Sequence, residues 1–531
     1  MYQQFEKRLS ECFQQIPKAV LTQSQIGLEK ESLRVAPNGS IAQTHHPLSF
    51  GSALTHPHIT TDYSEALLEF VTPPFQDKQK LLDFLRDCQT FVYEGMSDEF
   101  LWASSMPCVV AGEPSIPIAE YGSSNVGQMK NVYRRGLGHR YGRVMQVIAG
   151  IHYNFSFSDD FWQHYQAMCQ PEIETRDNKQ DFISESYFKL IRNFQRYGWL
   201  IPYLFGASPA VCKSFLRNVE TDMAPFDETT YYYPYATSLR VSDIGYQNIK
   251  EDESGIKVNY GSVEQYVESL RHAITTPHEP FAKMGVKIDG KYEQLNSNLL
   301  QIENEYYSSV RPKQILEDME MPINALKSRG VKYIELRSLD INIFEPCGIS
   351  DKALYFLESF MMFCLLDDSP PISMSEHKEI TKNIQDVARM GRKPGFKLHR
   401  NGESILLKDW AGEIFDQMEG VADLLDQNKN DISYRDILSH YKARVDDPDM
   451  TPSAQILKKM RENKEGFFHF SLRKSEEHLD YFKQLKLTSD QTLFFQNLTS
   501  ESLKKQKDIE VSDKVRFEDF LAEYFSHAVP D

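Results

Sequence analysis

Residues 27–35, GLEKESLRV, place two glutamates, Glu29 and Glu31, two positions apart among apolar residues. Gly27 opens the stretch and the turn sequence APNG closes it at 36–39, which favours a β-strand. Side chains two positions apart share a face on a strand, whereas on a helix they point apart. Both carboxylates therefore project side by side, with Cα atoms about 7 Å apart. Two interpretations are open here: a solvated strand face, or a half-buried pair that needs a cation.

Three other extended stretches also carry polar side chains on one face. In IHYNFSF (151–157), His152 and Asn154 lie opposite an apolar face, while EALLEFVT (65–72) sets Glu69 among leucines. In VKYIELRSLD (331–340), Glu335 and Arg337 share a side. Each has an ordinary structural alternative, such as a surface histidine or a structural ion pair. An unpaired buried carboxylate is costly, however, so Glu69 needs a partner.

If these strands are neighbours, their polar faces form one oxygen-rich set with a single imidazole and no thiolate. Such a set suits Mg²⁺, or Mn²⁺, rather than structural zinc. Four carboxylates exceed what one Mg²⁺ usually takes from protein, so two or three ions that share phosphate oxygens are expected. An arginine on the same face would neutralise a transferring phosphoryl group. The expected metal ligands are Glu29, Glu31, Glu69, His152 and Glu335, with Arg337 as the catalytic cation.

Three further segments combine tyrosine with arginine in polar surroundings. Residues 121–142 are Gly-rich and basic, and we interpret them as a loop in which Tyr133 and its neighbour Arg134 could clamp a carboxylate or phosphate. Tyr-rich loops supply hydroxyl groups and rigid walls for a small polar ligand. Solvated loops and tyrosines at a wet boundary are the alternatives. The remaining binding candidates are Arg240 and Tyr246 in PYATSLRVSDIGY (234–246) and Tyr307 in NSNLLQIENEYYSSVRPK (296–313).

Composition limits the classes of function. The chain has 531 residues, 41% of them hydrophobic and 25% charged, and a formal net charge of −17. That charge argues against a general nucleic-acid or anionic-membrane binder. Neither GxGxxG nor GxxxxGK[ST] occurs, so a nucleotide would be held by neither a Rossmann fold nor a P-loop. No apolar run approaches the 18 residues of a membrane span.

The seven cysteines are widely scattered and include no CxxC pair. We therefore expect neither a disulfide framework nor a zinc site, and a reduced cytoplasm is the expected location. The first residues lack the basic and apolar regions of a signal peptide.

The pattern of elements predicts an α+β fold without regular β-α-β alternation. Beyond residue 367 the chain becomes helix-rich and highly charged. We place a boundary near 370, with a catalytic core at 1–370 and a helix-rich C-terminal region at 371–531 packed on it. Helices are expected at 1–20, 77–99, 181–206, 261–275 and 351–366, extended pieces at 26–72, 143–157 and 331–344, and a Tyr-rich loop near 221–236.

About ten motifs, in order along residues 21–370, resemble the proteobacterial family of glutamate–cysteine ligases (γ-glutamylcysteine synthetases). They include GLEKESLRV, SALTHPHITTDYSEALLEFVTP, YGSSN, YRRGL, GIHYNFS, IPYLFGASPA, PYATSLRVSDIGY, NSNLLQIENEYY and YIELRSLDIN, and GRKPG at 391–395 extends the match. The resemblance implies a fold like that of glutamine synthetases, in which a bent antiparallel sheet forms a funnel surrounded by helices.

The resemblance also implies a reaction. With ATP and Mg²⁺, the γ-carboxyl group of L-glutamate would be joined to the amine of L-cysteine through a γ-glutamyl phosphate, the first step of glutathione synthesis. It implies that the predicted metal ligands hold the ions and that Arg337 meets the γ-phosphate. A monomer acting on these small molecules, with no nucleic-acid or membrane partner, is expected. The cysteine pocket would comprise Tyr133, Arg240, Tyr246 and Tyr307, with Asn154 and Arg134 as neighbours.

Three other functions remain to be distinguished. A related ligase could join glutamate to another small amine, because only the tyrosine pocket argues for cysteine. A metal-dependent phosphohydrolase would release phosphate from ATP without amino acids. A non-catalytic regulatory protein would tolerate the loss of Glu29 or Arg337.

Overall fold

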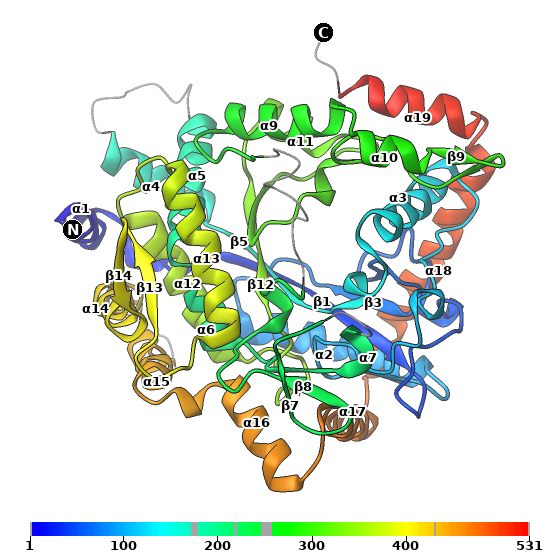
Figure 1. Ribbon diagram of the computed structural model, residues 1–531. Helices are drawn as coiled ribbons and strands as arrows, with labels where there is room; N and C mark the ends of the chain where they lie inside the picture. Colours follow the sequence, from blue (N-terminus) through cyan, green and yellow to red (C-terminus); the bar gives the residue numbers. More distant parts are fainter. Residues whose placement is uncertain (1–2, 171–178, 217–219, 246–256, 429–431, 529–531) are drawn as a thin grey trace.

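A computed structural model describes residues 3–170, 179–216, 220–245, 257–428 and 432–528. Its largest sheet has seven strands, all paired antiparallel, in the order β11–β12–β5–β1–β3–β2, with β4 added to the end of β1. Figure 1 shows β1 and β3 crossing the middle of the molecule, with β5 and β12 beside them. The seven strands are β1 (Gln25–Val35), β2 (Ile59–Thr61), β3 (Leu67–Val71), β4 (Phe100–Leu101), β5 (Ile151–Ser156), β11 (Val310–Lys313) and β12 (Tyr333–Leu339).

Smaller antiparallel sheets and many helices surround this sheet. The remaining strands are β6 (Ala210–Cys212), β7 (Ala224–Pro225), β8 (Thr230–Tyr232), β9 (Lys287–Ile288), β10 (Lys291–Tyr292), β13 (Lys397–Arg400) and β14 (Glu403–Leu406). The helices before residue 340 are α1 (Gln3–Gln15), α2 (Lys78–Gly95), α3 (Asn125–Tyr141), α4 (Asp159–Cys169), α5 (Lys179–Tyr197), α6 (Leu200–Phe205), α7 (Lys213–Leu216), α9 (Val263–Thr275), α10 (Glu279–Met284) and α11 (Pro322–Arg329). The later helices are α12 (Asp351–Leu366), α13 (Met374–Met390), α14 (Leu407–Leu425), α15 (Tyr434–Asp446), α16 (Pro452–Asn463), α17 (Phe467–Gln484), α18 (Ser489–Ser512) and α19 (Phe517–Ser526).

Strand β1 is buried on both faces, so the solvated interpretation of GLEKESLRV is wrong. Its paired neighbours β3 and β5 cover its edges, and Glu31 is only 3% exposed. The opposite face carries Lys30, which is also buried and donates a hydrogen bond to Gln89 of α2. A strand this deep carries charged side chains only where each has a partner.

Helix α12 forms the centre of the helical layer. Nearly all of its side chains are buried, and it packs against α2, α5, α14 and α15. Its one buried carboxylate, Glu358, pairs with Lys78 at 2.7 Å and accepts a hydrogen bond from the hydroxyl of Tyr434 at 2.5 Å. Helix α2, one of these neighbours, also contacts β1 and β3 of the large sheet.

The predicted α+β class with an antiparallel sheet is confirmed, and the funnel shape of glutamine synthetases stays a prediction. The helices expected at 77–99, 181–206, 261–275 and 351–366 are present as α2, α5 with α6, α9 and α12. The expectation of a loop at 121–142 is wrong. Residues 125–141 form α3, and the side chain of Ser124 caps its first turn. The Tyr-rich loop near 221–236 contains β7 and β8, and only 151–156 of the extended stretch 143–157 is a strand.

The structure contains a disulfide bond that the sequence did not predict, although the expectation was only that there is no disulfide framework. Cys108 and Cys212 are bonded, with Cα atoms 5.5 Å apart and 104 positions between them along the chain. Tertiary folding brings these two cysteines together, and their sequence spacing carries no sign of it.

Contacts cross the boundary predicted near residue 370, and the division itself stays a prediction. Arg392, just after α13, donates hydrogen bonds to the carbonyl groups of Pro234 and Ala236. The backbone amide of Thr237 donates to the carbonyl of Ala388 in α13. In the parts of the chain described above, no helix is long and apolar enough to cross a membrane.

Candidate active site

Register in the large sheet brings the predicted metal ligands together. Glu31 lies directly opposite Glu69 across β1 and β3, and Glu29 lies opposite His152 across β1 and β5. One strand further, Glu335 of β12 lies opposite Asn154. Three strands thus carry the acidic side chains, and β5 carries His152, in the neighbouring arrangement that the sequence predicted.

His152 is at the centre of this acidic cluster. Its Nδ1 lies 2.9 Å from Oε2 of Glu29 and 3.3 Å from Oε1 of Glu335, and its Nε2 lies 3.6 Å from Oε1 of Glu31. Ligand atoms of Glu29, His152 and Glu335 lie within 4.8 Å of one another, close enough to share one metal ion. Asn154, predicted as a neighbour of the cysteine pocket, donates a hydrogen bond to Oε1 of Glu29 at 2.9 Å, and its place beside the pocket stays a prediction.

The four carboxyl groups differ in their protonation behaviour. Burial raises the pKa of Glu69 well above its usual value, and the charge on Glu29 adds to that effect. Burial also raises the pKa of Glu31. For Glu29, burial is outweighed by the hydrogen bond with His152, which lowers its pKa. For Glu335, burial is outweighed by the charges of nearby cations, and its pKa falls well below the usual range.

Cations flank the cluster on the side of β11 and β12. Nη1 of Arg337 lies 2.7 Å from Oε1 of Glu335, and Nζ of Lys313 lies 3.3 Å from Oε2 of the same carboxylate. Arg311 is the cross-strand partner of Glu335. Sequence analysis had singled out Arg337 alone. Alternation along VRPK (310–313) puts Arg311 and Lys313 on one face and was the available signal for the other two.

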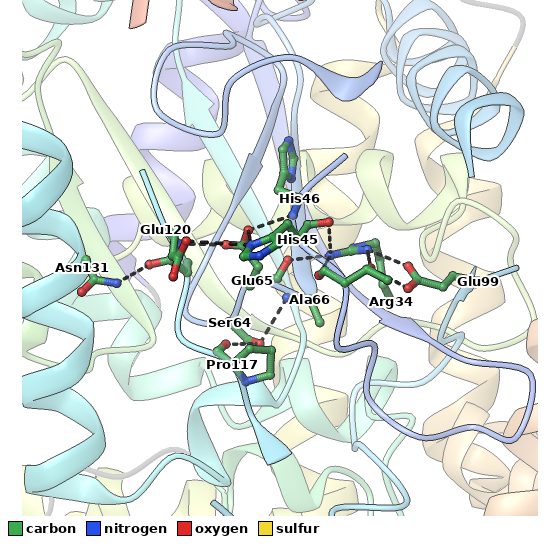
Figure 2. Close-up of polar contacts among 12 residues, drawn as sticks. Arg34, His45, His46, Ser64, Glu65, Ala66, Glu99, Pro117, Glu120 and Asn131 are labelled. Atoms are coloured by element: carbon green, nitrogen blue, oxygen red, sulfur yellow. Dashed lines mark hydrogen bonds and ion pairs between the residues drawn. The ribbon is translucent and has the colours of Figure 1, made fainter. Parts of the chain in front are cut away.

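The turn between β2 and β3 brings a further carboxylate, Asp62, toward the cluster. Its charge raises the pKa values of Glu31 and Glu69, which places it beside them. Figure 2 shows how the following residues of the turn are anchored: buried Arg34 donates to the carbonyl of Glu65 at 3.0 Å and pairs with Glu99 at 2.6 Å. Asp62 lies within the family-like motif at 52–73, but its role was not predicted.

The carboxylate of Glu65 anchors the same turn to two loops. Its two oxygens accept hydrogen bonds from the backbone amides of His46 and Glu120, both at 2.8 Å. Asn131 of α3 reaches the second of these loops through the carbonyl of Ala119 at 2.8 Å. The turn that carries Asp62 is therefore connected both to β1 and to α3.

Helix α3 presents Tyr133 and Arg134 to this region. Arg134 donates to the carbonyl of Asp62 and stacks over the ring of Tyr121, with its guanidinium carbon 4.6 Å from the ring centre. Burial raises the pKa of Tyr133, and the nearby charges that act on it include those of Arg134 and Arg311. Both predicted residues therefore lie beside the acidic cluster.

Arg240 approaches the cluster from the segment 234–243. It is 1% exposed, and its Nη1 donates to the carbonyl of Arg337 at 2.9 Å. Tyr307 lies close enough to Arg337 to affect its pKa, and it lines a cavity of about 180 Å³ together with Ser242 and Ser338. Tyr246, the remaining predicted pocket residue, lies outside the described residues. A larger cavity of about 490 Å³ near the start of α12 contains none of the predicted site residues.

The cluster fits divalent cations that prefer oxygen ligands. One buried oxygen beside it, Oδ1 of Asn154, accepts no hydrogen bond from any described residue. Buried polar atoms are normally satisfied, so an open acceptor beside several carboxylates is consistent with ion binding. No thiolate lies among these donors, which disfavours a structural zinc site.

Comparison with known proteins identifies the family of this chain. The sequence model of the glutamate–cysteine ligase family matches residues 9–387. Glutamate–cysteine ligases of Alcanivorax borkumensis and Pseudomonas putida are each 46% identical, over 98% and 99% of this chain and 99% and 98% of their own lengths. The crystal structure of glutamate–cysteine ligase from Francisella tularensis, in complex with AMP, superposes with a TM-score of 0.88 at 37% identity, covering 95% of this chain and 98% of that one.

A bifunctional glutathione synthetase from Pasteurella multocida has the same fold, with a TM-score of 0.72 at 24% identity, covering 93% of this chain and 58% of that one. The protein is an enzyme of the ligase class that forms carbon–nitrogen bonds. Within that class, the chain belongs to the glutamate–cysteine ligase family.

Proposed function

We propose that the acidic cluster and its surrounding cations carry out the family's reaction in this chain. That reaction joins the γ-carboxyl group of L-glutamate to the amine of L-cysteine with ATP, giving γ-glutamylcysteine, ADP and phosphate, the first step of glutathione biosynthesis. The observation that carries the assignment of the site is the convergence of β1 and β12 on His152 of β5, with Glu29, Glu31 and Glu335 within 3.6 Å of its ring nitrogens.

We assign the cluster as the metal site, for two or three Mg²⁺ ions, with Mn²⁺ as an alternative. When bound, the ions would offset the negative charge of the triphosphate and align it with glutamate. Arg337, already paired with Glu335, is placed to neutralise the transferring γ-phosphate. The proposed ligands are Glu29, Glu31, Glu69, His152 and Glu335, with Asp62 beside them.

The chemistry proceeds in two steps. An oxygen of the γ-carboxylate attacks the γ-phosphorus of ATP, which forms γ-glutamyl phosphate and releases ADP. The amine of cysteine then attacks the acyl carbon, phosphate leaves, and the proton lost by the amine passes to the departing phosphate or to a base. Arg240 is proposed to bind the carboxylate of cysteine, and Tyr133, Tyr246 and Tyr307 to form the walls around its thiol.

Oligomeric state, location, fold shape and domain division complete the proposal. We propose that the protein acts as a monomer in the cytoplasm, where ATP is available, on small molecules alone. We also propose that the bent sheet forms a funnel of the glutamine-synthetase type, and that residues 1–370 carry the chemistry.

The experiment that tests this function measures phosphate release with ATP and Mg²⁺, omitting each amino acid in turn. The ligase requires both glutamate and an amine acceptor, whereas a phosphohydrolase releases phosphate without either. A panel of small amines then separates cysteine from other acceptors. Glu29→Gln should abolish turnover and leave the thermal melting curve unchanged, while Glu6→Gln, on the exposed side of α1, should match wild type. Wild-type turnover in Glu29→Gln would remove the metal role.

A further inference from the structure

Lys313 neutralises a carboxylate that the proposed function assigns to metal binding. It is the last residue of β11, and its Nζ lies 3.3 Å from Oε2 of Glu335. Arg337 holds the other oxygen of that carboxylate at 2.7 Å. Both oxygens of Glu335 are thus paired with a cation, and this side chain is only 1% exposed. The Lys313 side chain is 30% exposed and reaches the carboxylate from the more exposed side.

These ion pairs conflict with metal binding. Glu335, Glu29 and His152 form the trio whose ligand atoms lie within 4.8 Å of one another. A divalent cation among them would lie beside the charges of Lys313 and Arg337, and like charges this close repel strongly where water is partly excluded. Both cations would gain a partner only if an anion arrived with the metal, and a triphosphate is such an anion.

Lys313 is better suited than Arg337 to exchange partners. Within the described chain its ammonium group has this single ion pair with Glu335, whereas Arg337 also lies 3.5 Å from Nδ1 of His152. A lysine is a compact charge on a flexible four-carbon stem, whereas the planar guanidinium of arginine is held in a fixed orientation. The side chain of Lys313 is 30% exposed, compared with 21% for that of Arg337.

We propose that Lys313 is a placeholder cation, which holds Glu335 while no metal is bound and turns to the phosphates of ATP once metal and nucleotide enter together. This inference depends on the proposed metal site. It makes metal and nucleotide binding mutually dependent: Lys313 opposes the metal alone and favours the metal with its triphosphate. Such coupling between two ligands is commonly 5–150-fold in affinity.

The test replaces Lys313 by methionine, which keeps most of the apolar stem and removes the charge. Mn²⁺ binding to the full-length protein is measured by electron paramagnetic resonance without nucleotide, and ATP binding is measured by calorimetry at saturating Mg²⁺ without amino acids. We expect Lys313→Met to bind Mn²⁺ about 10-fold more tightly and ATP about 10-fold more weakly. These opposite changes would not follow from loss of structure.

Two controls accompany the variant. Lys313→Arg keeps the charge and should retain both affinities near the wild-type values. Lys332→Met removes a nearby lysine that pairs with Asp159 instead, at 3.5 Å, and should change neither affinity. Melting curves without metal check that each variant is folded, and Lys313→Gln replaces the methionine variant if that one does not fold.

The outcomes separate the two proposals. If wild type binds Mn²⁺ and Glu29→Gln does not, but Lys313→Met binds it no more tightly than wild type, the placeholder role is wrong and the metal site stands. If Mn²⁺ binding is equal in wild type and Glu29→Gln, the proposed metal site itself is wrong.

Discussion

The guanidinium group of Arg240 donates a hydrogen bond to the backbone carbonyl of Arg337, with Nη1 and O 2.9 Å apart. One residue is the proposed anchor for the cysteine carboxylate and the other the proposed partner of the γ-phosphate. The bond therefore joins the proposed cysteine pocket to the backbone, and not to the side chain, of the proposed phosphate-binding residue.

Arg240→Lys should weaken the binding of cysteine with little effect on the binding of ATP. Lysine keeps a positive charge but loses the planar fork that can bind a carboxylate and a carbonyl at once. A hydrogen bond to a charged group contributes roughly 1.5–3 kcal/mol, so the KM for cysteine should rise about 10- to 100-fold. The KM for ATP should change less than 3-fold. Steady-state kinetics with each substrate varied measures both, and an unchanged KM for cysteine would contradict the assignment of Arg240.

Gly150 lets Arg240 lie against the backbone of the metal site. Its amide donates to Oε2 of Glu31 at 2.6 Å, and a Cβ atom built on it would come within 2.0 Å of Nη2 of Arg240. Gly150→Ala should therefore displace both side chains and lower kcat/KM by roughly 100-fold, since small misplacements near reacting groups have effects of that size.

The matched control for this prediction is Gly412→Ala in α14, where an added Cβ meets no atom within 4 Å. That variant should keep wild-type kinetics and melt at the same or a slightly higher temperature, because alanine favours the helix. If Gly150→Ala is as active as the Gly412→Ala control, the close approach of Arg240 is not needed for the reaction.

The C-terminal helices hold the start of α3. Asp513, at the end of α18, accepts hydrogen bonds from the backbone amide of Asn125 at 2.5 Å and from its side chain at 2.7 Å. Glu510 accepts from the amide of Ser123 at 2.8 Å. Behind α3, Leu521 of α19 packs in a small apolar cluster with Met129. Residues beyond 506 therefore support the helix that carries Tyr133 and Arg134.

Asp513→Ala should cost about 1 kcal/mol of stability, as the loss of a helix cap does. Because α3 borders the proposed pocket, the KM for cysteine should rise several-fold while the KM for ATP stays near wild type. Asp513→Asn should restore part of the effect, and Asp508→Ala, an exposed position on α18, should have none. Equal changes in both KM values would indicate a general loss of structure instead.

Period-2 alternation predicted the acidic face of the sheet because each strand is long enough to show it. For α3 the composition misled, because its glycines suggested a loop. Glycine is required at these positions because the helix packs closely against its neighbours. A Cβ on Gly136 would come within 2.2 Å of the side chain of Gln301, and one on Gly138 within 2.6 Å of the hydroxyl of Tyr63. Neighbours distant in sequence set such requirements, and for the same reason the Cys108–Cys212 bond could not be predicted. Lys313 was missed although alternation along 310–313 placed it on one face with Arg311.

Stability should fall in mild acid because of buried histidines near the β2–β3 turn. Burial, with the charge of Arg34 nearby, lowers the pKa of His46 to about 3, and burial lowers that of His56 to about 4. The folded pKa of each lies below the unfolded value near 6.5, so the unfolded state binds more protons below that pH. The free energy of unfolding should therefore decrease as the pH falls from about 6.5 toward 4, by up to about 1.4 kcal/mol per pH unit for each group.

Replacing His46 measures how much this one histidine contributes to the pH dependence of the free energy of unfolding. His46 lies edge-on to Phe50 with ring centres 5.8 Å apart, so His46→Phe removes the titrating ring and keeps an aromatic side chain there. Urea unfolding of this variant between pH 7.5 and 5 should show a shallower loss of stability than wild type. His440→Phe, at a position where burial lowers the pKa but leaves the ring more exposed, is the matched control and should change the slope less. A slope for His46→Phe as steep as that of wild type would show that His46 takes up no proton on unfolding in this range.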